Sequence, residues 1–86
     1  MANITIYTTR TCSYCNMAKS LLAKKGLSFD EIDVSGDPAE RQRMMVRANG
    51  RHSVPQIFIG ETHVGGSREL FDLERRGGLE PLLTAT

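Results

Sequence analysis

The chain begins with an alternation of apolar and polar positions that predicts a β-strand. In residues 3–9, NITIYTT, Ile4 and Ile6 alternate with more polar neighbours, which is the two-residue period of a strand. From residue 12 to residue 25 the apolar positions take the spacing of a helix, and Gly26 provides a suitable end. One face of this predicted helix carries Tyr14, Ala18, Leu21 and Leu22.

Residues 27–34, LSFDEIDV, predict a second strand with an irregular pattern. Leu27 and Phe29 follow one phase of the alternation, whereas Ile32 and Val34 follow the opposite phase. We therefore expect a strand that contains a bulge or ends early.

Residues 37–50, DPAERQRMMVRANG, carry the clearest helix signature in the chain. Asp37 is suited to the N-cap, Pro38 to the first helical position, and Glu40 to the reciprocal contact of a capping box. The Asn49-Gly50 pair then ends the predicted helix.

The last third of the chain predicts a hairpin followed by a helix. Residues 56–59 and 62–64 are short apolar strands joined by a glycine-containing turn. A helix then runs from a Ser67 N-cap to the glycine pair at 77–78, and residues 79–83 can add a short last turn.

The resulting order of elements, β-α-β-α-β-β-α, predicts one α/β domain over residues 1–86. The first strand-helix-strand unit implies parallel pairing through a crossover helix, whereas the late hairpin adds antiparallel strands. We therefore expect a four-stranded mixed sheet with helices on both faces.

Composition narrows the classes of function. The 86 residues have a formal net charge of +1, which argues against a nucleic-acid binder that works by neutralising phosphates. No apolar run approaches the roughly 20 residues that span a bilayer, and the first ten residues lack the pattern of a secretory signal. We expect a cytoplasmic monomer that binds neither nucleic acid nor membrane.

Cys12 and Cys15 are the only cysteines and are spaced C-x-x-C. Such a pair can be half of a metal site, a structural crosslink or a redox couple. The cytosol keeps thiols reduced, and so short a loop constrains the unfolded chain little. A structural zinc site needs four ligands, and His52 and His63 lie eleven positions apart. These considerations favour the redox couple.

The position of the pair predicts how the two thiols differ. Cys12 falls between a strand and a helix N-terminus, where free backbone N–H groups and the helix dipole stabilise a thiolate. Arg10 can add to this effect. Cys15 lies one turn further on and is expected to stay protonated, ready to resolve the mixed disulfide that Cys12 forms. A C-x-x-C after the first strand of a β-α-β unit is therefore a redox signal.

Two further motifs suggest how a substrate could be held. Pro55 can be a simple edge residue, or a cis Val54–Pro55 bond can turn the polar backbone groups of Val54 toward Cys12. The Gly65-Gly66-Ser67 stretch can be a plain loop and cap, or an anion site at a helix N-terminus. Together, a thiolate, an extended docking edge and a carboxylate pocket describe a site for a small acidic thiol peptide.

The stretches TCSYC, SVPQIFI, VGG and RRGGLEPLL give the chain a resemblance to the glutaredoxins, specifically the short dithiol bacterial kind. The resemblance covers nearly the whole chain. It implies a thioredoxin-like fold, a cis Pro55 and glutathione as the reducing co-substrate. It also implies that Cys12 is the nucleophile that carries the glutathionyl group and that Cys15 is the resolving thiol.

The same resemblance implies a set of glutathione-binding residues. Val54 pairs its backbone with the cysteinyl part, and Ser67 and Arg68 offer N–H groups to the γ-glutamyl carboxylate. Arg10 and Gln42 are the candidates for the glycine carboxylate. The full implied set is Arg10, Tyr14, Gln42, Ser53, Val54, Pro55, Gly66, Ser67 and Arg68.

Three positions depart from the family pattern. Ser13 replaces the usual proline inside the motif, which restores a backbone donor. Thr9 stands where a lysine is common. Arg68-Glu69 stands where an acidic pair is usual; Arg68 cannot meet the amino group of glutathione, whereas Glu69 can.

Two functions remain open from the sequence. The first is glutathione-dependent reduction of protein disulfides and of glutathione mixed disulfides. The second, prompted by Ser13, is a [2Fe–2S] carrier in which two chains and two glutathione molecules supply four thiolates. The expected partners are therefore glutathione and disulfide-containing or glutathionylated proteins.

Overall fold

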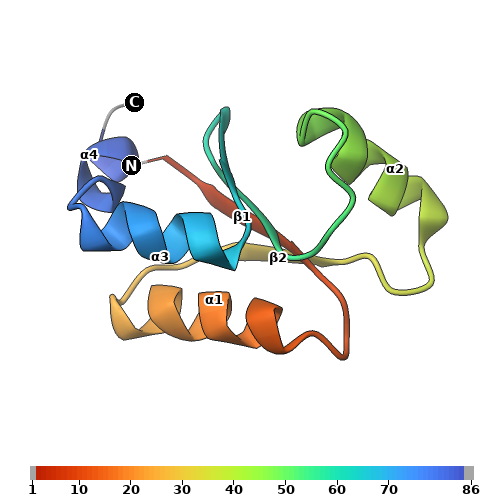
Figure 1. Cartoon of the computed structure of the whole chain (residues 1–86), viewed down its shortest axis with the longest axis horizontal. Coiled ribbons are helices and arrows are strands. Elements are labelled where there is room, and N and C mark those ends of the chain that lie inside the picture. The colour runs from red at the N-terminus through yellow and green to blue at the C-terminus, as the bar shows by residue number, and fades with distance from the viewer. Residues whose placement is uncertain (1, 85–86) are drawn as a thin grey trace.

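The computed structural model describes residues 2–84 as a four-stranded sheet with helices on both faces (Figure 1). The elements in chain order are β1 (Ile4–Thr8), α1 (Ser13–Lys24), β2 (Asp30–Asp33), α2 (Pro38–Arg47), β3 (Gln56–Ile59), β4 (Thr62–Gly65), α3 (Ser67–Arg75) and α4 (Leu79–Thr84). The strand order is β2-β1-β3-β4, with β1 parallel to β2 and the other pairs antiparallel. The predicted order and mixed sheet are confirmed, and α4 stands where a short last turn was expected.

The sheet buries a hydrophobic cluster on each face. On one face Ile4 and Ile6 of β1 pack with buried residues of α1, α3 and α4. On the other face Tyr7 and Phe58 pack with Met44 of α2. Because successive strand residues point to opposite faces, this arrangement follows from the alternation in the strands. Figure 1 shows α1 and α3 side by side and α2 across the sheet from them.

The irregular pattern of residues 27–34 is explained by this two-sided burial. Leu27 and Phe29 pack against the cluster beneath α1 and α3, whereas Ile32 and Val34 belong to the cluster beneath α2. The change of phase is therefore a change of face, and no bulge is needed to produce it. The register of β1 with β2 runs without a shift through the four pairs from Thr5–Asp30 to Thr8–Asp33, so the expectation of a bulge is wrong and the strand is simply short.

The predicted start of α2 is confirmed, but its capping box is only half formed. Asp37 Oδ1 accepts a hydrogen bond from the Glu40 N–H at 3.1 Å, and Pro38 occupies the first turn. The Asp37 N–H donates to the Val34 carbonyl instead of to Glu40. The Glu40 carboxylate accepts from Arg43 Nε at 2.7 Å, which takes it away from the reciprocal contact.

Within residues 2–84, no helix combines the length and the apolar character that crossing a membrane requires.

Candidate active site

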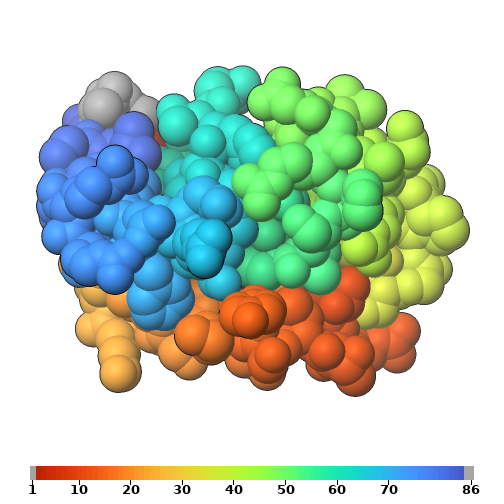
Figure 2. All heavy atoms as spheres, viewed as in Figure 1, coloured from red at the N-terminus to blue at the C-terminus, as the bar shows by residue number. Residues whose placement is uncertain are grey.

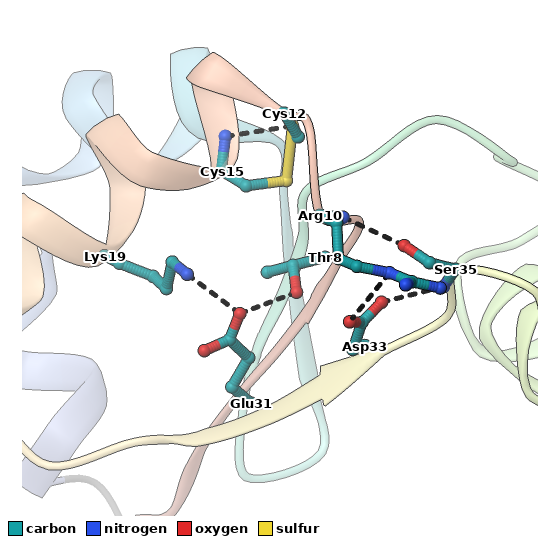
Figure 3. Close-up of polar contacts among 8 residues, drawn as sticks. All are labelled: Thr8, Arg10, Cys12, Cys15, Lys19, Glu31, Asp33 and Ser35. Carbon is teal, nitrogen blue, oxygen red and sulfur yellow. Dashed lines mark hydrogen bonds and ion pairs between the residues drawn. A yellow bond between two sulfur atoms is a disulfide. The ribbon is translucent and has the colours of Figure 1, made fainter.

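The junction of β1 and α1 places Cys12 at the N-cap of α1. Its backbone is extended, with φ −115° and ψ 106°, and its Sγ accepts a hydrogen bond from the Cys15 N–H at 3.1 Å (Figure 3). The two cysteines form a disulfide, with Cα atoms 5.2 Å apart. In the dithiol form the same N–H and the helix dipole favour a thiolate at Cys12.

The two cysteines differ in exposure. Cys12 is half-buried, whereas Cys15 is fully buried at 0% relative exposure. An attacking thiol must be reached by its substrate, and a resolving thiol needs to reach only its neighbour. The difference in exposure is consistent with the expected roles, attack by Cys12 and resolution by Cys15, which stay predictions.

A polar cluster of Thr8, Lys19 and Glu31 links the helix that carries Cys15 to the sheet. Lys19 lies one turn beyond Cys15 on α1, and its Nζ is 2.9 Å from Glu31 Oε2 on β2. The same oxygen accepts a hydrogen bond from Thr8 Oγ1 of β1 at 2.7 Å (Figure 3). Lys19 and, secondly, Thr8 hold the pKa of Glu31 below its usual value. These contacts connect α1 to both parallel strands, β1 and β2.

The loop before β3 approaches Cys12 from the opposite side. The Val54–Pro55 peptide bond is cis, as the resemblance implies. The Val54 carbonyl oxygen lies 3.8 Å from Cys12 Sγ, although the two residues are 42 positions apart in the chain. A chain segment bound alongside Val54 would therefore lie next to the sulfur of Cys12.

An open groove of about 310 Å³ continues from this loop to the start of α3. Figure 2 shows the beginning of α1, the loop before β3 and the beginning of α3 adjoining on one face of the molecule. All members of the implied glutathione-binding set except Arg10 and Gln42 line the groove. The lining residues are Tyr14, Arg51, Ser53, Val54, Pro55, Gly66, Ser67, Arg68 and Glu69.

The α3 end of the groove is built around an ion pair that the sequence did not reveal. Glu69 Oε1 accepts a hydrogen bond from the Gly66 N–H at 2.5 Å and lies 3.5 Å from Arg51 Nη2. Partial burial opposes ionisation of Glu69, but Gly66 and Arg51 outweigh it and hold the pKa of Glu69 below its usual value. The carboxylate that was a candidate partner for an amino group already has two partners within the chain.

The cap of α3 differs from its prediction. Gly66 occupies the N-cap and Ser67 is the first helical residue, so the expectation of a Ser67 N-cap is wrong. The reason is the Glu69 side chain, which folds back onto the Gly66 N–H and organises the first turn one residue earlier. Ser67 is buried and lines the end of the groove, whereas Arg68 beside it is exposed.

Arg10 and Gln42 lie apart from the groove. The Arg10 N–H donates to Ser35 Oγ at 2.9 Å, and its guanidinium, with a side chain 75% exposed, lies 4.0 Å from Asp33 (Figure 3). Gln42 is exposed on α2. Its neighbour Arg41 reaches the loop instead, with Nη2 donating to the His52 carbonyl at 2.8 Å. A contact of Arg10 or Gln42 with glutathione stays a prediction.

Known proteins resemble this chain over almost its full length. The glutaredoxin family model matches residues 4–64. The chain is 53% identical over 83 residues to Glutaredoxin 3 of Escherichia coli (strain K12), covering 96% of this chain and 99% of that protein. The crystal structure of a buckwheat glutaredoxin–glutathione complex matches with a TM-score of 0.86 and 26% identity, covering 98% and 78% of the two chains. A solved structure concerned with metal binding of glutaredoxins matches with a TM-score of 0.73 and 52% identity, covering 96% and 89%.

Fold and dithiol together place the protein among the thiol–disulfide oxidoreductases with a thioredoxin-like fold. Within that class the sequence identifies one family, because the matching family model and the full-length relatives are all glutaredoxins. The chain belongs to the glutaredoxin family.

Proposed function

We propose that the protein is a glutathione-dependent oxidoreductase that reduces protein disulfides and glutathione mixed disulfides. The observation that carries the proposal is the half-buried Cys12 Sγ, held at the N-terminus of α1 and 3.8 Å from the Val54 carbonyl at the start of the groove. The groove ends at the N-terminus of α3, where backbone N–H groups suit a carboxylate. An extended peptide with a central thiol and an acidic end fits this layout.

The monothiol route uses Cys12 alone. Its thiolate attacks the glutathione sulfur of a protein–glutathione disulfide, so that the Cys12–glutathione bond forms and the protein thiolate leaves and takes up a proton. A second glutathione thiolate then attacks the mixed disulfide. Oxidised glutathione departs and the Cys12 thiolate is restored, so two electrons pass from glutathione to the client protein.

The dithiol route adds Cys15. Cys12 attacks a protein disulfide and becomes linked to one of its sulfurs, while the other leaves as a thiolate. Cys15, deprotonated as it attacks, displaces the client from Cys12 and leaves the Cys12–Cys15 disulfide that the structure contains. Two glutathione molecules then reduce this disulfide in two exchange steps.

The proposed setting is a monomer in the cytoplasm, with residues 1–86 acting as one domain. The likeness to bacterial glutaredoxins, including Glutaredoxin 3 of E. coli, supports this setting. The proposed clients are glutathionylated or disulfide-bonded proteins, and glutathione is the co-substrate. The buckwheat relative in complex with glutathione supports that choice of co-substrate.

Turnover of a small glutathione mixed disulfide by cysteine variants tests the proposal. We expect Cys12→Ser to fall to about the uncatalysed rate, because the nucleophile is lost, and Cys15→Ser to keep about half of the wild-type rate or more. With a protein disulfide as substrate, both variants should be inactive. An inactive wild type with glutathione as reductant, or an active Cys12→Ser variant, would contradict the proposal.

A [2Fe–2S] carrier is the second candidate. Cys12 is the reachable sulfur and Cys15 is buried, so one chain offers one thiolate to a cluster that needs four. Among residues 2–84 no three His, Cys, Asp or Glu side chains gather as a metal site of their own. Two chains and two glutathione molecules would complete the set, and the relative studied for metal binding gives the idea support.

Anaerobic reconstitution with iron, sulfide and glutathione tests this second candidate. If it holds, the protein turns brown and sediments as a dimer, and Ser13→Pro removes the colour because it removes a backbone donor beside Cys12. Proline is tolerated at the first position of a helix, which Ser13 occupies, so the variant should stay folded. A colourless monomer would rule against the carrier role.

A further inference from the structure

Gln56 has a buried side chain that is folded back onto the loop beside Cys12. It is the first residue of β3 and follows Pro55 directly, and its relative exposure is 0%. Its Nε2 donates to the Ser53 carbonyl oxygen at 3.0 Å and reaches Ser53 Oγ at 3.3 Å. The side-chain amide of Gln56 therefore bonds back to Ser53 and closes the turn that contains Val54 and Pro55.

The other end of the same amide contacts β4. Gln56 Oε1 lies 2.6 Å from His63 Nε2, and the His63 ring stacks on Phe58 with centroids 4.9 Å apart. His63 lies on β4 directly opposite Phe58 of β3, and packing against Phe58 holds the His63 ring in place. The side chain of Gln56 connects the loop to the interior of the sheet.

These hydrogen bonds fix the orientation of the Gln56 amide and the tautomer of the His63 ring. The Ser53 carbonyl oxygen can only accept, so Gln56 must turn its NH₂ group toward it. Gln56 Oε1 can also only accept, so His63 must present a proton on Nε2. Ser53 Oγ accepts from Gln56, which leaves the Ser53 hydroxyl proton free to donate into the groove that Ser53 lines.

We propose that Gln56 is a positioning residue for substrate binding: with His63 it clamps the Ser53–Pro55 turn so that Val54 meets the substrate backbone beside Cys12. The inference rests on the proposed function, because it assigns Val54 to the bound thiol peptide. Gln56 itself touches neither Cys12 nor the groove. Its effect should therefore fall on substrate binding and leave the chemistry of Cys12 unchanged.

Gln56→Leu removes the donors while keeping a side chain of similar size, and Ile59→Val is its control. Ile59 is buried further along the same strand and is not one of the residues that line the groove, so its truncation measures lost stability. For Gln56→Leu we expect the KM for a small glutathione mixed disulfide to rise about tenfold. The kcat and the alkylation rate of Cys12 should stay within about twofold of wild type.

The outcome separates positioning from simple stabilisation. A KM unchanged within about twofold, together with a loss of thermal stability like that of Ile59→Val, would overturn the proposal. If the wild-type protein fails to turn over the mixed disulfide at all, the proposed function is wrong. The contacts of Gln56 are then tested by a second measurement, which uses the wild-type protein and needs no activity.

That second measurement is the tautomer of His63, read from ¹⁵N chemical shifts of the wild type at neutral pH. Burial, helped by Arg51 and opposed by Glu69, lowers the pKa of His63, so the ring is neutral there. The clamp predicts a proton on Nε2 and none on Nδ1. The opposite tautomer, or an even mixture, would contradict the hydrogen bond from His63 to Gln56 and would overturn the proposal.

Discussion

At the scale of single residues, charge in the groove is set by a contact between distant positions. Arg51 precedes β3 and Glu69 lies in the first turn of α3, and their side chains meet at 3.5 Å. The sequence identified Glu69 as a candidate partner for an amino group but offered no sign of Arg51. Only the fold shows that Arg51 already pairs with this carboxylate and would compete with a substrate amino group for it, because nothing in the spacing of charges predicts the contact.

Glu69→Gln tests how this carboxylate contributes to stability. The pKa of Glu69 is lowered in the folded protein, so its stabilisation is present above the unfolded value near 4.5 and is lost as pH falls through the folded value. We expect Glu69→Gln to cost about 0.5 kcal/mol at pH 7, a small figure because the pair is nearly half exposed. The cost should be smaller at about pH 3 than at pH 7, because the carboxyl group takes up protons below its unfolded value.

Urea unfolding at the two pH values measures this difference. Glu61→Gln, in the exposed hairpin turn, removes the same negative charge and serves as the control. A cost for Glu69→Gln that is equal at both pH values would show that the charge of Glu69 does not stabilise the fold.

At the scale of elements, local signals predicted most boundaries. Asp37 and Pro38 start α2, and Gly26 follows α1 with φ +71°, as their residue types require. The failures came where a distant or neighbouring side chain competed. Glu69 moved the cap of α3 from Ser67 to Gly66, and Arg43 drew Glu40 away from its capping box. Local rules describe what a residue can do, and packing decides which option it takes.

Gly65→Ala tests the junction of β4 and α3, with Gly77→Ala as its matched control. Both glycines have positive φ, +117° and +74°, so each alanine variant meets backbone strain. A Cβ at Gly65 would lie 2.8 Å from Glu69 Oε1 and 3.1 Å from Arg51 Nη1, whereas one at Gly77 would meet nothing within 4 Å.

The expected losses of unfolding free energy differ for that reason. Gly77→Ala should cost about 1 kcal/mol from the left-handed backbone alone. Gly65→Ala should cost about 2 kcal/mol or more, because it also displaces Glu69 from its cap. Equal losses in a denaturant titration would mean that the Glu69 contact adds nothing to this junction.

At the scale of the whole molecule, the sheet brings three separate segments to one edge. The start of α1, the turn before β3 and the start of α3 meet there, and each was recognised in the sequence as a possible site element. Periodicity predicted the strands of the sheet that joins them, although the two apolar phases of residues 27–34 were interpreted as a bulge or an early end. That the three segments form one site was supported by the resemblance rather than by any pattern within the chain.

Two residues of the implied set, Arg10 and Gln42, lie apart from the groove, and their contact with glutathione stays a prediction. Arg10 follows β1, and the parallel pairing of β1 with β2 brings it to Asp33 and Ser35. Gln42 lies on an exposed position of α2 while Arg41 faces the loop.

The most direct test of the account is to find which cysteine takes up glutathione. The reduced Cys15→Ser and Cys12→Ser variants are treated with oxidised glutathione, and the adduct is located by peptide mass spectrometry. The account predicts a single glutathionyl group on Cys12 in the Cys15→Ser variant, removable by reduced glutathione, and no comparably fast adduct on Cys15 in the Cys12→Ser variant. An adduct that forms equally fast on Cys15, or none on Cys12, would contradict the assignment of Cys12 as the glutathione-carrying nucleophile.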